Sequence, residues 1–273
     1  QAVPAFAYNN LNLSGSGTKT GSGTITVSGN LINNMGIVFS GTTTLNLNGT
    51  THSNGGTIST ATLSVGSGAT LTNNGTITTS TALSGAGTLT QGATGILNIG
   101  GTTGIAGLNA SAAGNTVNYT GTGQTVIPTT YHHLTLSGSG TPILTGLTTI
   151  NGNFTLSGTV APVADAGMTI AGNFTIGSGT SFDAGSFSHT LKCNWSNAGT
   201  FNPGTSTFTL SGTSAQTMSG SAFNNLSIAN TAGVTMLTDE TINGTFTLTS
   251  GAFSIGAHTL NLNGALSIAT GSL

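Results

Sequence analysis

The segment Ile150–Leu156 reads Ile-Asn-Gly-Asn-Phe-Thr-Leu, and its pattern returns three times later in the chain. In every copy an aliphatic residue is followed by any residue, a glycine, any residue, a bulky apolar residue, a threonine or serine, and a second aliphatic residue. Adjacent copies lie about 20 residues apart, which is a typical coil length for a solenoid. The further copies are Ile170–Ile176, Ile242–Leu248 and Leu262–Ile268.

This pattern predicts short strands that each bury one face. Apolar residues or glycine alternate with polar residues, so one face of an extended segment points inward. A unit of this length cannot enclose a core alone, whereas a stack of such units can. We therefore predict an all-β fold, a single elongated parallel β-solenoid (β-helix) with roughly 20 residues per coil and about 13 coils.

A longer repeat runs through the second half of the chain. The phrase that begins at Tyr131 returns at Phe223, 92 residues later and without a gap. This spacing indicates the duplication of a block of several coils, with copies near residues 119–210 and 210–273. A third opening of the same kind stands at Tyr8.

The remaining segments complete the predicted domain organisation. Residues 1–7 form an apolar N-terminal segment, and residues 8–273 form the β-solenoid. Within it, residues 82–118 are rich in Gly and Ala, and we expect them to be less regular than the rest.

The composition excludes several classes of protein. Only 2% of the residues are charged, compared with about 25% in typical soluble domains. Residues that favour helices, such as Glu, Lys and Arg, are almost absent. There is no apolar run of the roughly 18 residues that a membrane helix needs, and no basic cluster that would attract nucleic acid. We expect neither membrane insertion nor a nucleic-acid partner.

Two features of the sequence suggest an extracellular or cell-surface protein. The chain begins at Gln1 rather than at a methionine, which is consistent with removal of a secretion signal. Its one cysteine, Cys193, cannot form an internal disulfide, so packing has to supply the stability. Cys193 stands where other copies of the repeat have glycine, and we expect it to be a small buried thiol.

No group of residues indicates catalysis, a cofactor or a metal. The five His, two Lys or Arg and four Asp or Glu are scattered along the chain. Glycosidases need two placed carboxylates, and the lyases and hydrolases built on parallel β-helices use clustered Asp, Lys or Arg. We therefore predict that the protein is not an enzyme and has neither catalytic, cofactor-binding nor metal-binding residues.

Three pairs of residues nevertheless deserve separate tests. Asp239-Glu240 is the one adjacent acidic pair, and we expect a solvated corner rather than a catalytic dyad. His132-His133 occupies positions that hold Asn-Asn in the other blocks, which favours a structural turn over a metal site. Asp165 and Asp183 are 18 residues apart, close to one coil, and could form only a weak Ca²⁺ contact.

Bulky residues recur at one position of the coil and predict an internal column of aromatic side chains. Stacked in register, such residues would gain about 0.5–1.5 kcal/mol per pair beyond their burial. The asparagines beside them either form a ladder from coil to coil or simply suit a turn. The core column comprises Phe154, Phe174, Trp195 and Phe246, and the asparagines are Asn153, Asn173 and Asn194.

Threonine is abundant and raises a different function. Ice-binding solenoids present regular ranks of outward threonine on a flat face. Here the Thr-x-Thr phrases, such as Thr24–Thr26 and Thr76–Thr78, do not recur at one fixed position of the coil in the sequence. Threonine is also an ordinary solvated strand residue. Ice binding remains the third-ranked alternative.

The repeats resemble those of a known class of proteins. The phrases at Tyr8–Thr20 and Ile150–Leu156 are similar to the repeats of large secreted bacterial surface proteins, which are adhesin-like and filament-like β-solenoids. The resemblance covers most of the chain, most clearly after Gly121, and it implies a β-solenoid fold and an extracellular location. It supplies no catalytic residues.

These observations predict a self-assembling subunit. We recognise no charged or helical cap at either end of the repeats, and an open strand edge invites pairing. We expect homopolymerisation, head to tail, into an extracellular filament through end-on β-strand pairing, with residues 1–7 as an inter-subunit donor strand. The alternative is an adhesin stalk or a module that binds surface glycans. The predicted assembly interface comprises Ala2, Val3, Pro4, Ala5, Phe6, Ala7, Leu266 and Ile268.

Overall fold

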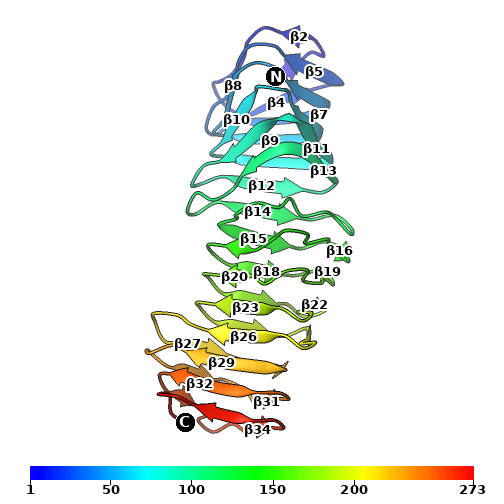
Figure 1. Ribbon diagram of the computed structural model, residues 1–273. Helices are drawn as coiled ribbons and strands as arrows, with labels where there is room; N and C mark the ends of the chain where they lie inside the picture. The colour runs from blue at the N-terminus through cyan, green and yellow to red at the C-terminus, as the bar shows by residue number, and fades with distance from the viewer. The chain divides into compact units, whose positions relative to one another are not determined.

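The computed structural model describes the whole chain, from Gln1 to Leu273, as parallel strands without a helix. Its backbone contacts form two compact units, residues 1–132 and 133–273, which we describe separately. In each unit the chain winds in turns of about 20 residues, and the strands of successive turns pair in parallel (Figure 1). The predicted fold class, an all-β parallel β-solenoid with about 13 turns, is confirmed. No segment forms a helix that is long and apolar enough to cross a membrane.

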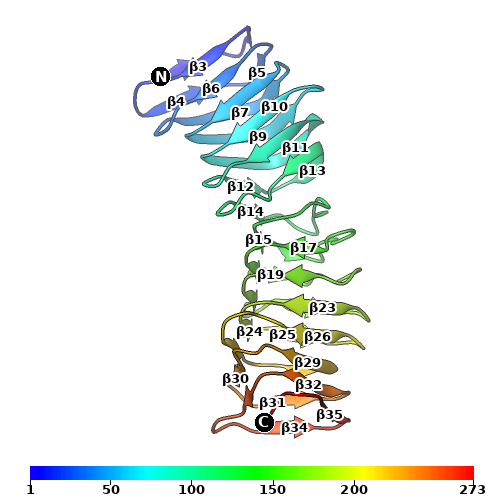
Figure 2. The same ribbon diagram turned by 60° about the vertical axis from the view of Figure 1, so that its left-hand side comes forward.

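The first unit has three sides. Its three parallel ladders begin with β1, β2 and β3, which pair with β4, β5 and β6. Strands β7, β9 and β11 continue from one side to the next and shift register at the corners (Figure 2). The strands are β1 (Ala2–Val3), β2 (Ala7–Tyr8), β3 (Leu11–Leu13), β4 (Thr18–Gly21), β5 (Thr24–Val27), β6 (Leu31–Asn33), β7 (Val38–Leu47), β8 (Thr51–Asn54), β9 (Thr57–Val65), β10 (Thr70–Asn73), β11 (Thr76–Gln91), β12 (Ile96–Ile99), β13 (Thr102–Asn109) and β14 (Thr116–Tyr119).

The segment 82–118 is more regular than its composition suggests. Most of it lies in β11, β12, β13 and β14, which pair in register apart from one shift between Gly85 and Thr88. The inward residues of these strands are still aliphatic, as at Leu83, Leu97 and Val117, and all three are fully buried. Most of the Gly and Ala residues therefore take outward and corner positions, although Ala110 is buried, and the alternation that specifies the strands is kept.

A ladder of buried amides runs through the first unit. The Nδ2 of Asn33 donates to Oδ1 of Asn54 at 2.8 Å, Asn54 donates to Asn73 at 2.7 Å, and Asn73 donates to Oε1 of Gln91 at 2.6 Å. The second N–H of each asparagine donates to a backbone carbonyl, as in the bond from Asn33 to Thr57 at 3.1 Å. The inward orientation of Asn33 and Asn73 cannot be predicted from the sequence, because it depends on where each strand ends.

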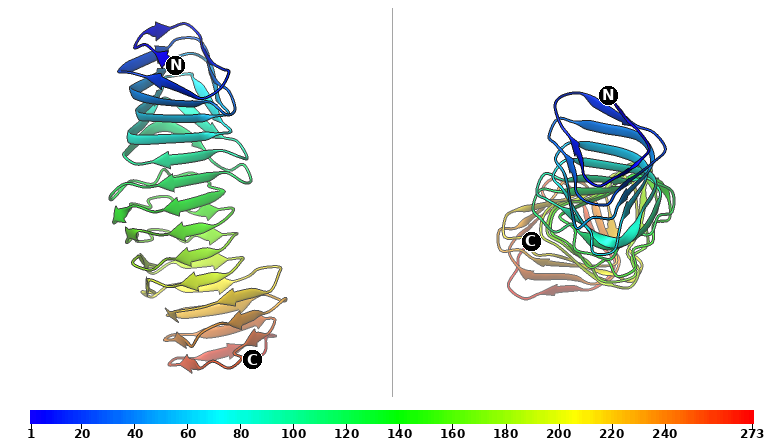
Figure 3. Two further views of the ribbon diagram at one scale, coloured as in Figure 1. Left: turned by 180° about the vertical axis from the view of Figure 1, so that it is seen from behind. Right: turned by 90° about the horizontal axis from the view of Figure 1, so that it is seen from above.

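The second unit is built around a seven-stranded parallel sheet. Successive strands of this sheet, β17, β20, β23, β26, β29, β32 and β35, each come from one turn (Figure 3). Shorter ladders form the other sides. The strands are β15 (His133–Leu136), β16 (Ser139–Gly140), β17 (Thr149–Ile150), β18 (Phe154–Leu156), β19 (Thr159–Val160), β20 (Thr169–Ile170), β21 (Phe174–Ile176), β22 (Ser181–Asp183), β23 (Ser188–Leu191), β24 (Trp195–Asn197), β25 (Thr200–Asn202), β26 (Thr207–Leu210), β27 (Gln216–Met218), β28 (Ala222–Phe223), β29 (Asn225–Ala229), β30 (Val234–Met236), β31 (Glu240–Ile242), β32 (Phe246–Ser250), β33 (Phe253–Ser254), β34 (Leu260–Leu262) and β35 (Leu266–Ile268).

The predicted aromatic column forms from three of its four members. Phe154, Phe174 and Trp195 lie in register on β18, β21 and β24. The rings of Phe154 and Phe174 stack with centroids 4.9 Å apart, and Trp195 meets Phe174 edge-on at 5.1 Å. Trp195 also contacts the rings of Phe201 and Phe208, so the column widens into an aromatic cluster.

Phe246 lies on a different side of the turn. It is fully buried, but it pairs with Leu226 and Leu266 in the seven-stranded sheet and contacts the ring of Phe253. The reason is the length of the repeat. A block of 92 residues makes about four and two-thirds turns of roughly 20 residues, so the second copy is rotated by one side of a three-sided turn.

The asparagines beside the column combine the two expected roles. Each sits in a turn, and its side-chain oxygen accepts a backbone N–H from the next turn. The Oδ1 of Asn153 accepts from the N–H of Asn173 at 2.9 Å, and that of Asn173 accepts from Asn194 at 3.1 Å. The glycine before Asn173 is required by close approach, because a Cβ on Gly172 would clash with the backbone of Gly152. Cys193 stands at the equivalent position before Asn194.

We expect Trp195→Ala to destabilise the fold strongly. Trp195 is 1% exposed, and its Nε1 donates to Oγ of Ser221 at 2.9 Å. Loss of such a side chain costs about 3–5 kcal/mol, because a cavity remains. Urea unfolding followed by circular dichroism measures the loss. Tryptophan fluorescence cannot follow the unfolding of this variant, because Trp195 is the one tryptophan.

The matched control is Leu237→Ala, in the same unit but 52% exposed. It should change stability by less than about 0.5 kcal/mol. Equal losses for the two variants would contradict the assignment of Trp195 as the centre of the core.

Candidate functional site

The groups that could perform chemistry remain dispersed in the fold. No three His, Cys, Asp or Glu side chains come together as a metal-binding group. Asp183 lies in register with Val163 and not with Asp165, and its Oδ1 accepts the N–H of Gly185 at 2.9 Å. The structure thus gives no basis for a Ca²⁺ site between the two aspartates.

The predicted turn role of the second histidine in His132-His133 agrees with its hydrogen bonds. Nδ1 of His133 accepts the backbone N–H of Asn153 at 2.9 Å. At the equivalent positions, Oδ1 of Asn10 accepts from Asn30 at 2.7 Å and Oδ1 of Asn225 accepts from Thr245 at 2.8 Å. Histidine and asparagine are interchangeable here because both offer an acceptor to the next turn. His132 also uses Nδ1, which accepts the N–H of Gly114 at 3.1 Å.

Two further histidines are buried inside the turns. His52 accepts the N–H of Leu31 on Nδ1 at 3.1 Å, and its Nε2 lies 3.2 Å from the carbonyl oxygen of Gly49. His189 has the equivalent contacts, with the N–H of Met168 at 3.3 Å and the carbonyl of Ala184 at 3.0 Å. Both contacts are satisfied at once only by a neutral ring with its proton on Nε2.

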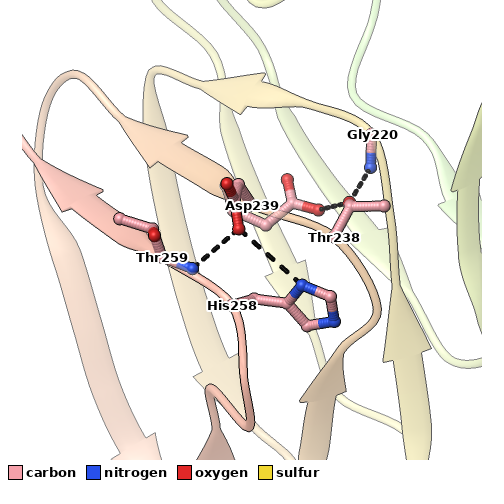
Figure 4. A network of polar contacts seen from close by, with 6 residues as sticks. Gly220, Thr238, Asp239, His258 and Thr259 are labelled. Atoms are coloured by element: carbon pink, nitrogen blue, oxygen red, sulfur yellow. Dashed lines mark hydrogen bonds and ion pairs between the residues drawn. The ribbon is translucent and has the colours of Figure 1, made fainter.

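The acidic pair is divided between surface and interior, which corrects the expected solvated corner. Asp239 is exposed, and its Oδ1 lies 3.7 Å from Nδ1 of His258 and accepts the N–H of Thr259 at 2.8 Å (Figure 4). Glu240 is only 1% exposed, because it begins β31 and its side chain points inward. Its carboxylate accepts the N–H of Ser221 at 3.0 Å and the hydroxyl of Thr238 at 2.9 Å.

Cys193 is exposed, so the prediction of a buried thiol is wrong. It stands in the turn between β23 and β24, where the other copies have glycine. That glycine position lies at a corner and not on an inward face, which the alternation in the sequence does not distinguish.

The first turn has one paired edge and one open edge. Residues 1–7, expected to serve as a donor strand, lie along their own chain: Ala2 pairs with Thr20 in β4, and Ala7 pairs with Thr26 in β5. Strands β1, β2 and β3 have no partner on their other edge. Residues 1–7 therefore offer an unpaired backbone edge to another strand, but they are held in β1 and β2 and are not a free donor strand.

A hollow lies against this open edge. Its lining includes Val3, Tyr8, Leu11 and Leu13 from the first turn and Lys19 from β4. Lys19 points inward, is 8% exposed, and donates from Nζ to the carbonyl of Ser16 at 3.1 Å. An inward charge beside an edge limits unspecific pairing, so the first turn is partly guarded, in contrast to the expected absence of any charged cap.

The last turn exposes its core positions. Leu266 and Ile268 point to the side where Phe246 and Leu248 are buried one turn earlier, yet they are 43% and 54% exposed. Strands β34 and β35 pair only with β31 and β32, so their other edges are open (Figure 2). Apolar side chains and unpaired backbone groups therefore occur together at this turn.

A row of hydroxyl groups marks the outer face of the seven-stranded sheet. At one fixed position every strand carries a single threonine or serine, whereas the Thr-x-Thr phrases at Thr24–Thr26 and Thr76–Thr78 lie in different ladders, as the sequence predicts. The spacing of the row varies between 18 and 21 residues, which hides it in the sequence. The row comprises Thr149, Thr169, Thr190, Thr209, Ser227, Thr247 and Ser267.

Comparison of this chain with protein family models, with curated proteins and with solved structures finds no match. Among the features described above, the open edges of the first and last turns are the strongest candidate site, because they combine unsatisfied backbone groups with exposed apolar side chains. Residues 2–7, Leu266 and Ile268 are predicted for this site from the sequence, whereas β3, β34 and the hollow are not.

Acid should destabilise the fold through the two buried histidines. Burial lowers the pKa of His52 and of His189 below 6.5, and the hydrogen bond to a backbone carbonyl offsets this in part. The unfolded chain then binds more protons once the pH falls below about 6.5, so stability is complete above that pH and is lost as the pH falls toward the folded-state pKa. The loss is at most about 1.4 kcal/mol per pH unit for each histidine.

Urea unfolding at pH 7 and pH 5 tests this expectation. A double variant, H52Q and H189Q, serves as the control and should lose less stability than the native chain between the two pH values. Other titrating groups, including Glu240, contribute equally to both proteins and cancel. An equal loss in both proteins would show that these histidines do not carry the pH dependence.

We expect Glu240→Gln to stabilise the protein at neutral pH. Burial raises the pKa of Glu240 above 4.5, as does the nearby charge of Asp239, while hydrogen bonds from Thr238, Ser221 and Gly220 oppose the rise. A raised folded-state pKa gives stability that is present below about pH 4.5 and lost as the pH rises through the folded-state value. A neutral amide avoids that loss, and the hydroxyl of Thr238 can turn to accept from it.

The urea midpoint of Glu240→Gln should thus exceed that of the native chain at pH 7, and the difference should shrink toward pH 4.5. Asp239→Asn is the control, because Asp239 is exposed and should have a smaller effect. A lower midpoint for Glu240→Gln at pH 7 would mean that its hydrogen bonds outweigh the cost of its burial.

Proposed function

We propose that this chain is a secreted structural subunit that polymerises head to tail into an extracellular filament. The observation that carries the proposal is the exposure of Leu266 and Ile268 at core positions of the last turn, beside strands with an open edge. A further turn of parallel strands would cover these side chains and pair these backbone groups, and in the proposed filament the first turn of a second copy supplies it.

Backbone pairing at such a joint is favourable because both surfaces already have strand conformation. Adding a strand to an open edge forms main-chain hydrogen bonds without ordering a flexible segment. The two surfaces differ, since one belongs to the first turn and the other to the last. A contact between unlike surfaces does not close on itself and extends into a filament.

The charge content favours association. With 2% charged residues and a formal net charge of −2, the subunits repel one another little, and a net charge near zero promotes association. Since apolar burial and backbone hydrogen bonds would hold the joint, assembly should persist at high salt. The repeat resemblance to secreted surface proteins supports the extracellular location.

A second candidate is recognition of a regular polar surface, such as a glycan or ice, by the hydroxyl row of the seven-stranded sheet. The observation that favours it is the in-register repetition of seven hydroxyl residues. Parallel strands space such groups about 4.8 Å apart. Selective binding on a glycan array, or thermal hysteresis in freezing water, would support this candidate.

The proposed polymerisation is tested by electron microscopy and sedimentation of the purified chain at moderate and high salt. We expect uniform fibres from the native chain. Leu266→Lys places a charge on the open core of the last turn and should reduce the sedimenting fraction at least tenfold. The matched control is Leu237→Lys, since Leu237 is 52% exposed and lies away from β35.

The outcome decides the proposal. Monomers at all concentrations of the native chain, or fibres of Leu266→Lys that equal those of the control, would contradict it. Circular dichroism of both variants checks that neither substitution disturbs the fold.

A further inference from the structure

We infer that the ligand of the hydroxyl row is ice, and that the outer face of β23, β26, β29 and β32 binds it. These strands belong to four successive turns of the second unit (Figure 1). The inference rests on the second candidate function, recognition of a regular polar surface, and selects one class of ligand within it. It does not depend on polymerisation.

A second polar row lies beside the hydroxyl row on the same face. Residues two positions apart in a strand point to the same side, so the residues two positions before the hydroxyl row also point outward. Ser188 lies opposite Thr207, and Thr207 lies opposite Asn225. Oδ1 of Asn225 accepts the N–H of Thr245 from the next turn at 2.8 Å. The two rows form a grid with two polar side chains per turn: Ser188 and Thr190, Thr207 and Thr209, Asn225 and Ser227, and Thr245 and Thr247.

The spacing of this grid is close to that of a tetrahedral water lattice. Neighbouring strands lie about 4.8 Å apart. In ice, hydrogen bonds of about 2.75 Å meet at tetrahedral angles, so two oxygens bonded to the same third oxygen lie about 4.5 Å apart. Across the three intervals between four turns, the mismatch adds up to about 0.9 Å, which is well below one oxygen spacing. Successive hydroxyls of a row can therefore take successive oxygen positions of one ice layer.

The hydroxyl groups of the grid are well positioned and available to water. Thr190, Thr209 and Thr247 are half-buried between their neighbours, and the χ1 angle of threonine is stiff. Their hydroxyls form no hydrogen bond within the chain. An outward row of the first unit differs, because Nδ2 of Asn118 donates to Oδ1 of Asn98 at 2.7 Å. Side chains that bond to one another in this way have fewer groups left for a water lattice.

The chemistry of the face favours ice over a glycan. Sites for small ligands are concave and lined largely by apolar and aromatic side chains. On these strands the aromatic residues alternate with the grid and are buried, as are Phe208 and Phe246. None of the eight grid residues is charged or aromatic. The face therefore offers hydroxyl groups to an extended array of water, but no ring on which a sugar could stack.

Uptake into growing ice tests the inference. Ice that grows slowly in a solution of the purified chain excludes ordinary solutes and takes up a protein that binds its surface. Thr209→Lys places a long charged side chain in the middle of the grid and should reduce the fraction taken up at least fivefold. The matched control is Thr200→Lys, because Thr200 is exposed on β25, outside the grid. Circular dichroism checks that both variants keep the fold.

We expect uptake of the native chain and of Thr200→Lys, and its loss in Thr209→Lys. Equal uptake of all three proteins would overturn the assignment of the face. If the native chain is not taken up but binds a glycan array, and Thr209→Lys does not, ice is the wrong ligand and the second candidate function stands. If the native chain binds neither ice nor glycans, that candidate function fails together with this inference.

Discussion

The parallel backbone pairing of each strand with its counterpart about 20 residues later is the interaction on which the structure depends. Each turn contributes only short strands, and such strands are stable only when they are stacked on neighbouring turns that pair their backbone and cover their apolar side chains. This pairing aligns like with like, so residues of one type form columns. The aromatic column, the amide ladder and the hydroxyl row all follow from this alignment.

Near absence of charge follows from the same constraint. In a stack, a charged residue at a repeated position would face an identical charge one strand spacing away, and like charges opposite one another are destabilising. Uncharged Thr, Ser and Asn can be repeated in register without that penalty. The charged residues that remain, such as Lys19 and Glu240, interrupt columns and are each satisfied by local hydrogen bonds.

Features that recur in every turn can be predicted from the sequence, whereas features that occur once cannot. The period of the Ile150–Leu156 pattern and the alternation of apolar residues are enough to predict strands, turns and the column at Phe154, Phe174 and Trp195. Phe246 is misplaced because the sequence does not reveal how many sides a turn has.

Positions at corners are the other source of error. Glu240 and Cys193 both lie where a strand meets a turn, and a shift of one residue there exchanges inside for outside. The open edges of β3 and β35 are also not predictable from the sequence. They depend on which strand each one pairs with, and the pattern of apolar residues within a strand does not identify its partner.

The amide ladder of the first unit has a direction. All of its side chains donate the same way, from Asn33 toward Gln91, so their dipoles add as peptide dipoles do along a helix. Such an array must end in one acceptor without a donor and one donor without an acceptor, and Oδ1 of Asn33 and Nε2 of Gln91 are those two atoms. The unfavourable ends stay two in number however long the array becomes, whereas every rung adds a bond. Polar interiors of this kind are therefore more stable in long stacks than in short ones.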